Sequence, residues 1–139
     1  MADVSTFEDV PLPVDKVWDT IGDFSGIRKW AGLVEKETTE DTPQGKVRTL
    51  NMPEGRTVRE RLVASSQYSY TYGMLDRPEM ADYRSTVAVI PLDAGTTRIT
   101  LIVHLSPSEG LTDDAITERY TKSLGGNLRA MKRALGLPR

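Results

Sequence analysis

The chain has no cysteine and only one histidine, His104, among its 139 residues. Without cysteine, a disulfide scaffold, a thiol nucleophile and a cysteine-ligated metal site are all excluded. A single histidine cannot build a histidine-rich metal site either. We therefore expect no metal site and no cofactor.

An excess of charge of one sign and long apolar runs are also missing. The 18 basic and 20 acidic residues give a net charge of -2 without any basic run, which argues against nucleic acid as a partner. No apolar run approaches the roughly 20 residues of a membrane span, and the acidic first ten residues hold no apolar signal core. We expect a cytoplasmic protein that does not insert into membranes. Its length favours one domain over residues 1–139, because two ordinary domains need a longer chain.

Two stretches have the three-and-four spacing of apolar residues that is typical of amphipathic helices. The first begins at Pro13, which suits the first turn of a helix, and ends at Gly22. Ser25 is then expected to cap a second short helix that extends through Trp30. The other stretch starts at Thr112 and predicts a C-terminal helix of about 24 residues.

Elsewhere the apolar period is two, which predicts strands. The expected strands span residues 3–10, 34–40, 45–52, 56–64, 67–75, 82–92 and 97–106. Short connections between them predict antiparallel pairing in chain order. The predicted fold class is α+β, a curved antiparallel sheet of about seven strands wrapped around the long C-terminal helix, with two short helices after the first strand. Such a sheet leaves room above the helix, which is a natural place for a ligand cavity.

One predicted hairpin carries opposite charges on its apolar face. If its turn centres on Glu54, Arg48 lies opposite Glu60 and Leu50 lies opposite Val58. A carboxylate and a guanidinium then point into a mostly apolar interior, where buried charges need partners. The pair is either a structural contact that fixes the hairpin register or part of a functional site.

The element order and several segments resemble the START/birch-pollen-allergen helix-grip superfamily (SRPBCC) over nearly the whole chain. These segments are PVDKVWDTIGDFSGIRKW, GKVRTL, GRTVRERL, DYRSTV and NLRAMKRALG. The bacterial polyketide cyclase/dehydrase-type branch is the most similar, and there is a weaker similarity to the plant abscisic acid receptors. NMPEG and RPEMADYRS resemble the gate and latch loops of those receptors, so both are expected at the mouth of the cavity. The resemblance implies a helix-grip fold that binds a small hydrophobic or aromatic molecule.

Strand parity and helix spacing select the side chains that face the predicted cavity. Glu60, Arg48 and Tyr83 are the candidates for catalysis. Glu60 would be a general acid or base, Arg48 its partner or a contact to a substrate oxygen, and Tyr83 a hydroxyl donor. The candidates for ligand binding are apolar, aromatic or small and polar: Leu50, Met52, Val58, Tyr70, Tyr72, Ser85, Val87, Leu101, Val103, Tyr120 and Asn127.

Parity and spacing also place residues outside this site. His104 falls on the convex face, away from the cavity, so a surface role is the simpler interpretation. Ala64 is expected on the inner face together with Leu62. The pair Gly125 and Gly126 within the long helix either lets a ligand or the sheet approach the backbone or marks a bend.

Three functions are compatible with these features. The first is an enzyme that cyclises, dehydrates or aromatises a polyketide-like substrate, and the second is a non-catalytic carrier or sensor of the START or hormone-receptor type. The third is an interaction module whose cavity is filled by side chains. The sequence identifies neither the ligand nor a protein partner.

Overall fold

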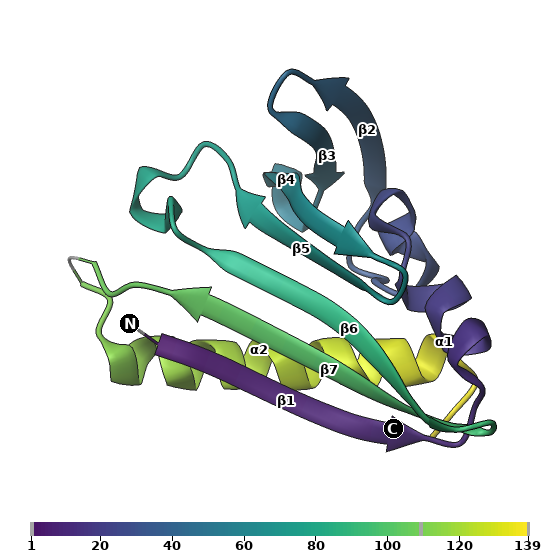
Figure 1. Ribbon diagram of the computed structural model, residues 1–139. Coiled ribbons are helices and arrows are strands. Elements are labelled where there is room, and N and C mark those ends of the chain that lie inside the picture. The colour runs from purple at the N-terminus through teal and green to yellow at the C-terminus, as the bar shows by residue number, and fades with distance from the viewer. Residues whose placement is uncertain (1, 109, 139) are drawn as a thin grey trace.

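The computed structural model describes residues 2–108 and 110–138. Its centre is a seven-stranded sheet in the order β1-β7-β6-β5-β4-β3-β2, in which every neighbouring pair is antiparallel. From β2 to β7 each strand lies beside the next, and β1 lies beside β7 (Figure 1). The strands are β1 (Ala2–Val10), β2 (Lys36–Thr42), β3 (Gly45–Asn51), β4 (Thr57–Ser66), β5 (Ser69–Met74), β6 (Arg84–Asp93) and β7 (Thr96–Leu105).

The long helix α2 (Asp113–Ala134) lies along β1 and β7 (Figure 1). As predicted, Thr112 caps its N-terminus, where the hydroxyl accepts a hydrogen bond of 3.1 Å from the Ala115 backbone N–H. The helix has 22 residues, and its apolar stripe is buried against the sheet: Ile116, Leu124, Leu128 and Met131. This stripe anchors α2 to one half of the sheet.

Two short helices follow the first strand, as the sequence predicts: α1 (Val14–Ile21) and the 3-10 helix η1 (Phe24–Lys29). The predicted cap of the second helix is wrong by two residues. The Asp23 carboxylate, not Ser25, caps η1 and accepts a hydrogen bond of 2.9 Å from the Ser25 backbone N–H. Asp23 has the extended backbone that a capping residue needs, whereas Ser25 already lies inside the helix.

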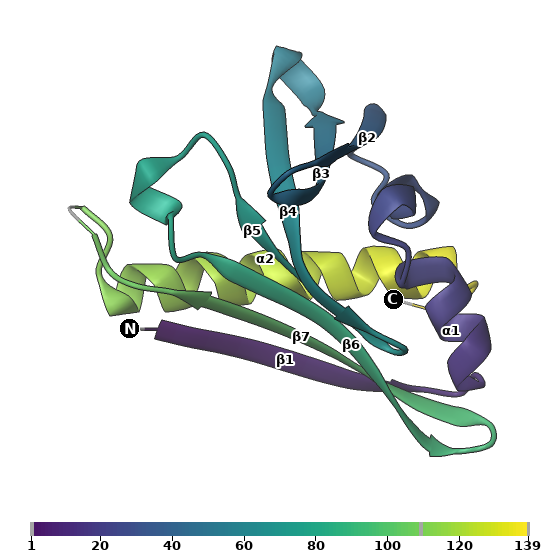
Figure 2. The same cartoon turned by 45° about the horizontal axis from the view of Figure 1, so that its top comes forward.

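The two halves of the sheet have different relations to α2. Strands β1 and β7 pack against the helix, whereas β2, β3 and β4 curve away from it (Figure 2). Helix η1 packs against β2 in this second half. Single turns, η2 (Pro53–Gly55) and η3 (Pro78–Met80), precede β4 and β6.

The predicted hairpin register is confirmed. Arg48 lies opposite Glu60, and Leu50 lies opposite Val58. Glu54, at the predicted centre of the turn, has a φ of 65° in the left-handed region. The predicted inner faces of the last two strands are confirmed as well, because every one of these residues is buried: Ser85, Val87 and Val89 on β6, and Ile99, Leu101, Val103 and Leu105 on β7.

Two details of the strand predictions are wrong. Strand β2 begins at Lys36, and Val34, the expected first strand residue, is instead a buried residue of the preceding loop. A β-bulge follows Leu62 and shifts the pairing of β4 with β5 by one residue. Because a one-residue shift reverses which side chains face inward, Ala64 is exposed rather than on the inner face.

Candidate functional site

A cavity of about 520 Å³ lies between the inner face of the sheet and α2. Its walls come from β3 to β7, from α2, and from the segment that contains the end of η1 and the loop after it. Most of the predicted site residues border it: Leu50, Met52, Val58, Glu60, Tyr72, Tyr83, Ser85, Val103, Tyr120 and Asn127. Side chains therefore do not fill this space, so the observation that would favour the third function, an interaction module, is not met.

Four predicted site residues do not border the cavity: Arg48, Tyr70, Val87 and Leu101. All four are buried in the core. The last three form one row across the sheet, because Tyr70 lies opposite Val87 and Val87 lies opposite Leu101. The rings of Trp18 and Phe24 pack against Tyr70, 6.2 Å and 5.8 Å between centroids, and so cover this end of the sheet.

The neighbouring row of residues on the sheet does border the cavity. Tyr72 lies opposite Ser85, and Ser85 lies opposite Val103. Each of these three residues is two positions along its strand from Tyr70, Val87 or Leu101, the buried row that does not border the cavity. Strand parity therefore predicted the correct face, but not how far along each strand the cavity extends.

Arg48 and Glu60 form a buried ion pair across β3 and β4. Arg48 Nε donates a hydrogen bond of 2.7 Å to Glu60 Oε1, and Arg48 Nη1 donates one of 3.0 Å to the carbonyl oxygen of Phe24. The guanidinium carbon lies 4.3 Å from the ring centroid of Phe24 and 4.7 Å from that of Tyr72, distances typical of cation–π contacts. Arg48 thus ties the sheet to η1, while its partner Glu60 borders the cavity.

The electrostatics of the pair follow from burial and from the neighbouring groups. Burial raises the pKa of Glu60 above its ordinary value, and the attraction of Arg48 opposes this rise. Burial disfavours the charged form of Arg48, but Glu60, Tyr70 and Tyr72 together raise the pKa of Arg48 above its ordinary value. Arg48 is therefore a permanent cation, and Glu60 holds a proton more readily than an exposed glutamate does.

Hydroxyl groups gather beside Glu60. Burial raises the pKa of Tyr72 and of Tyr83, and the neighbouring Ser85 partly opposes the rise in both. The two phenols therefore stay protonated and can donate hydrogen bonds over the whole physiological pH range. The ring of Tyr83 lies 6.3 Å from that of Tyr72 and 5.7 Å from that of Tyr120, so aromatic faces extend across the cavity to α2.

Helix α2 supplies the opposite wall through Tyr120, Asn127 and Gly126. A side chain added at Gly126 would meet only the end of Arg129, at 3.8 Å, so no part of the sheet needs this glycine. Gly125 does not border the cavity. The alternative in which the glycine pair lets the sheet approach is therefore wrong, and a ligand can contact the helix backbone at Gly126.

Part of the wall was not predicted from the sequence. Ile27 and Val34 border the cavity from η1 and the loop after it. The carboxylate of Glu37 on β2 holds η1 in place, because it accepts hydrogen bonds from the backbone N–H groups of Ile27, at 3.0 Å, and Arg28, at 3.3 Å. Periodicity could not reveal this contact, since it joins a helix end to an edge strand.

The two predicted mouth loops differ in position. Met52 borders the cavity beside η2, whereas residues 77–80 do not. Met80 instead contributes its side chain to the core, and only 7% of it is exposed. The expectation that both loops surround the mouth is therefore supported for the first loop and stays a prediction for the second.

His104 lies on the convex face, as predicted. Its Nδ1 pairs with the Asp3 carboxylate at 2.5 Å on the neighbouring strand β1. Among the residues that the structure describes, no group of three or more histidine, aspartate or glutamate side chains is arranged to hold a metal ion. The polar chemistry at the cavity is therefore that of one carboxylate, the ammonium group of Lys122, several hydroxyls, one indole N–H and one amide.

A cavity between a curved sheet and a long C-terminal helix is the arrangement that the sequence resemblance implied. The family model described as polyketide cyclase / dehydrase and lipid transport matches residues 1–136. The chain belongs to this family. Comparison with curated protein sequences gives no match.

Solved structures confirm the START-like helix-grip fold of this polyketide cyclase / dehydrase family member. The XoxI protein of Bacillus cereus is 25% identical, with 97% of this chain and 96% of that chain covered and a TM-score of 0.81. A START superfamily protein of Mycobacterium smegmatis is 10% identical, with 98% of each chain covered and a TM-score of 0.79. The Zhui aromatase/cyclase of a Streptomyces species is 22% identical, with 96% and 90% covered and a TM-score of 0.67.

Membership of the family accords with a role in binding hydrophobic molecules. Within the described part of the chain, no helix has the length and apolar character needed to cross a membrane.

Proposed function

We propose that the protein binds a small aromatic molecule in the cavity between its sheet and α2. The observation that carries this proposal is the cavity itself, about 520 Å³ in volume. Small-molecule pockets have volumes of about 300–1,000 Å³ and combine mostly apolar walls with a few polar groups. Here the apolar part comes from the side chains of Leu50, Val58, Val103 and Leu124.

The walls favour a flat ligand with a hydroxyl or carbonyl group. The rings of Tyr72, Tyr83 and Tyr120 offer aromatic faces and edges to such a ligand. Glu60 can accept a hydrogen bond from a phenol, and the Asn127 amide can donate one to a carbonyl oxygen. A polyketide-like aromatic compound combines these features.

The raised pKa of Glu60 at the cavity wall favours a second function, cyclisation with dehydration. In this proposal the Glu60 carboxylate removes a proton from a carbon between two substrate carbonyls. The resulting enolate carbon bonds to a third carbonyl carbon, whose oxygen takes a proton from Tyr72 or Tyr83. That oxygen then leaves as water with the proton that Glu60 took up, while the tyrosine phenolate removes the second proton from the same carbon. A carbon–carbon double bond forms, and both Glu60 and the tyrosine return to their starting states. The likeness to the Streptomyces aromatase/cyclase supports this class of reaction.

The melting temperature with and without 2-naphthol, a two-ring phenol, tests the binding function. Binding to the folded state alone must raise the melting temperature as the ligand concentration increases. Gly126→Trp places a large side chain into the cavity wall, and Gly125→Trp is the matched control outside it. A rise that persists in the Gly126→Trp variant would contradict the proposed location.

Mass spectrometry of the protein incubated with an aromatic poly-β-ketone tests the catalytic function. We expect loss of water from the substrate with the wild type and no such loss with Glu60→Gln. A ligand that is bound but recovered unchanged from the wild type identifies a carrier or sensor and contradicts catalysis.

A further inference from the structure

A second, smaller hollow of about 240 Å³ lies between the end of η1 and the last turns of α2. We call it the outer hollow. Trp30, Gly32 and Ala130 border both the outer hollow and the main cavity, so the two spaces adjoin. A ligand in the main cavity can therefore extend a substituent into the outer hollow.

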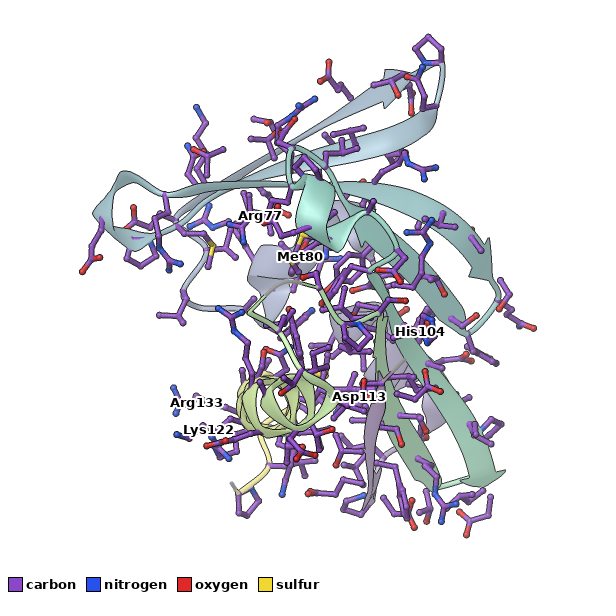
Figure 3. All side chains as sticks on the ribbon, turned by 90° about the vertical axis from the view of Figure 1, so that its left-hand side faces the viewer. Arg77, Met80, His104, Asp113, Lys122 and Arg133 are labelled. Carbon is purple, nitrogen blue, oxygen red and sulfur yellow. The ribbon has the colours of Figure 1, made fainter. Side chains whose placement is uncertain are left out.

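The outer hollow is strongly cationic. Arg28, Lys29 and Arg133 border it, and none of its described lining residues is acidic. The structure gives neither Arg28 nor Arg133 an ion-pair partner among the described residues, whereas Lys29 pairs with Asp23 at 3.4 Å. Figure 3 shows the side chain of Arg133 projecting from α2 on the side away from the sheet. Two positive charges are thus available to a ligand.

Trp30 adds an uncharged donor at the boundary of the two spaces. Its side chain is buried, with 8% of the residue exposed, and its Nε1–H has no hydrogen-bond partner among the described residues. A buried donor without a partner is uncommon, because its lost contact with water is not replaced. A ligand oxygen beside Trp30 would supply the missing acceptor.

We propose that the ligand of the main cavity carries a carboxylate that sits in the outer hollow. There it pairs with Arg28 and Arg133 and accepts a hydrogen bond from the Trp30 N–H. This inference rests on the proposed binding function and names its ligand class, an aromatic carboxylic acid. The arginines of the outer hollow fix the orientation of the ligand, since they attract its carboxylate, whereas Glu60, already paired with Arg48, offers an acceptor for a hydroxyl at the other end.

The end of α2 does not cancel this attraction. The C-terminus of a helix has a partial negative charge of about half a unit, which disfavours an anion nearby. The full positive charge of Arg133 in this last turn exceeds that partial charge, and Arg28 adds another from η1. The net field in the outer hollow is therefore positive.

Titration calorimetry with two probes tests the inference: 2-naphthol and 6-hydroxy-2-naphthoate, which differ by one carboxylate. Each exposed charge pair is worth a few-fold in affinity, and pairing weakens as salt increases. At low salt we expect the double variant R28Q/R133Q to weaken naphthoate binding by about tenfold and naphthol binding by less than about twofold. Trp30→Phe, which keeps an aromatic ring but removes the donor, should weaken naphthoate binding by about threefold relative to naphthol.

Lys46→Gln is the control, because it removes one positive charge from a residue that borders neither space. Equal losses for both probes in R28Q/R133Q, or the same loss in Lys46→Gln, would overturn the inference and leave the proposed function intact. If the wild type binds neither probe, both the inference and the proposed function are contradicted.

Discussion

Arg48 donates a hydrogen bond of 2.7 Å to Glu60, yet only Glu60 borders the cavity. The same guanidinium also holds the carbonyl oxygen of Phe24 at 3.0 Å and so fixes η1 to the sheet. Arg48 therefore has a structural role, whereas the Glu60 carboxylate can contact a ligand in the cavity. This arrangement joins the two interpretations that the sequence left open.

Removing one member of the pair should be far more damaging than removing both. Arg48→Met leaves the buried Glu60 carboxylate without a cation, which should lower the free energy of unfolding by about 3–5 kcal/mol. The double variant R48M/E60L should recover most of that loss, because apolar side chains of similar size replace the pair. Urea unfolding of the wild type, Arg48→Met and R48M/E60L measures these differences in the free energy of unfolding.

The exposed pair of Arg59 and Asp76 is the control for this cycle. Arg59→Met should change the free energy of unfolding by less than about 1 kcal/mol, since solvent screens the pair. A loss in Arg48→Met that is no larger than the loss in Arg59→Met would contradict a buried, energetically coupled pair.

The raised pKa of Glu60 predicts how stability changes with pH. Because burial raises this pKa above the ordinary value of 4.5, the folded protein holds the proton to higher pH than the unfolded chain does. The contribution of Glu60 to stability is therefore complete below about pH 4.5 and is lost as the pH rises through the folded-state pKa. Glu60→Gln cannot titrate at this position.

We expect the free energy of unfolding of the wild type, minus that of Glu60→Gln, to fall as the pH rises above about 4.5. Urea unfolding of both proteins across this range measures the difference. A difference that rises with pH would show that the attraction of Arg48 outweighs burial and lowers the pKa of Glu60.

Two neighbouring tyrosines should respond in opposite ways to loss of the hydroxyl. The Tyr70 hydroxyl is buried and has no hydrogen-bond partner among the described residues, so Tyr70→Phe should leave stability unchanged or raise it by about 1 kcal/mol. Tyr72→Phe removes the hydroxyl of a tyrosine that lies opposite Ser85 in the cavity wall and should lower stability by about 1 kcal/mol. Thermal unfolding distinguishes these results, and greater destabilisation by Tyr70→Phe than by Tyr72→Phe would contradict the assignment.

The two helix glycines form another matched pair. Alanine is favoured over glycine inside a helix by about 1 kcal/mol, and an added Cβ meets no close contact at Gly125 or Gly126. Both alanine variants should therefore be more stable than the wild type. Only Gly126→Ala should alter the dissociation constant of 2-naphthol, because only Gly126 borders the cavity. Equal effects of the two variants on binding would contradict the position of the cavity wall.

The hairpin register could be predicted from the sequence because its determinants are local. The turn at Glu54 and the period of two place Arg48 opposite Glu60 without any knowledge of the rest of the fold. The bulge after Leu62 could not be predicted in this way, since an alternating pattern assumes regular pairing.

The extent of the cavity was beyond the sequence for a different reason. Tyr70 and Tyr72 share a face of β5, yet Trp18 and Phe24 cover only the first closely enough to exclude it from the cavity. That coverage depends on how α1 and η1 pack, which residue spacing does not specify. The outer hollow depends likewise on the distance between η1 and the end of α2. The proposed role of Trp30, a hydrogen-bond donor to a ligand, follows from its position at this hollow.

The central claim is that a small aromatic molecule binds between the sheet and α2. A crystal structure of the protein with 2-naphthol tests it most directly. We predict ring density between Tyr72 and Tyr120, with the naphthol hydroxyl within hydrogen-bond distance of the Glu60 carboxylate. An empty cavity in crystals saturated with the phenol, or naphthol bound only outside it, would contradict the claim.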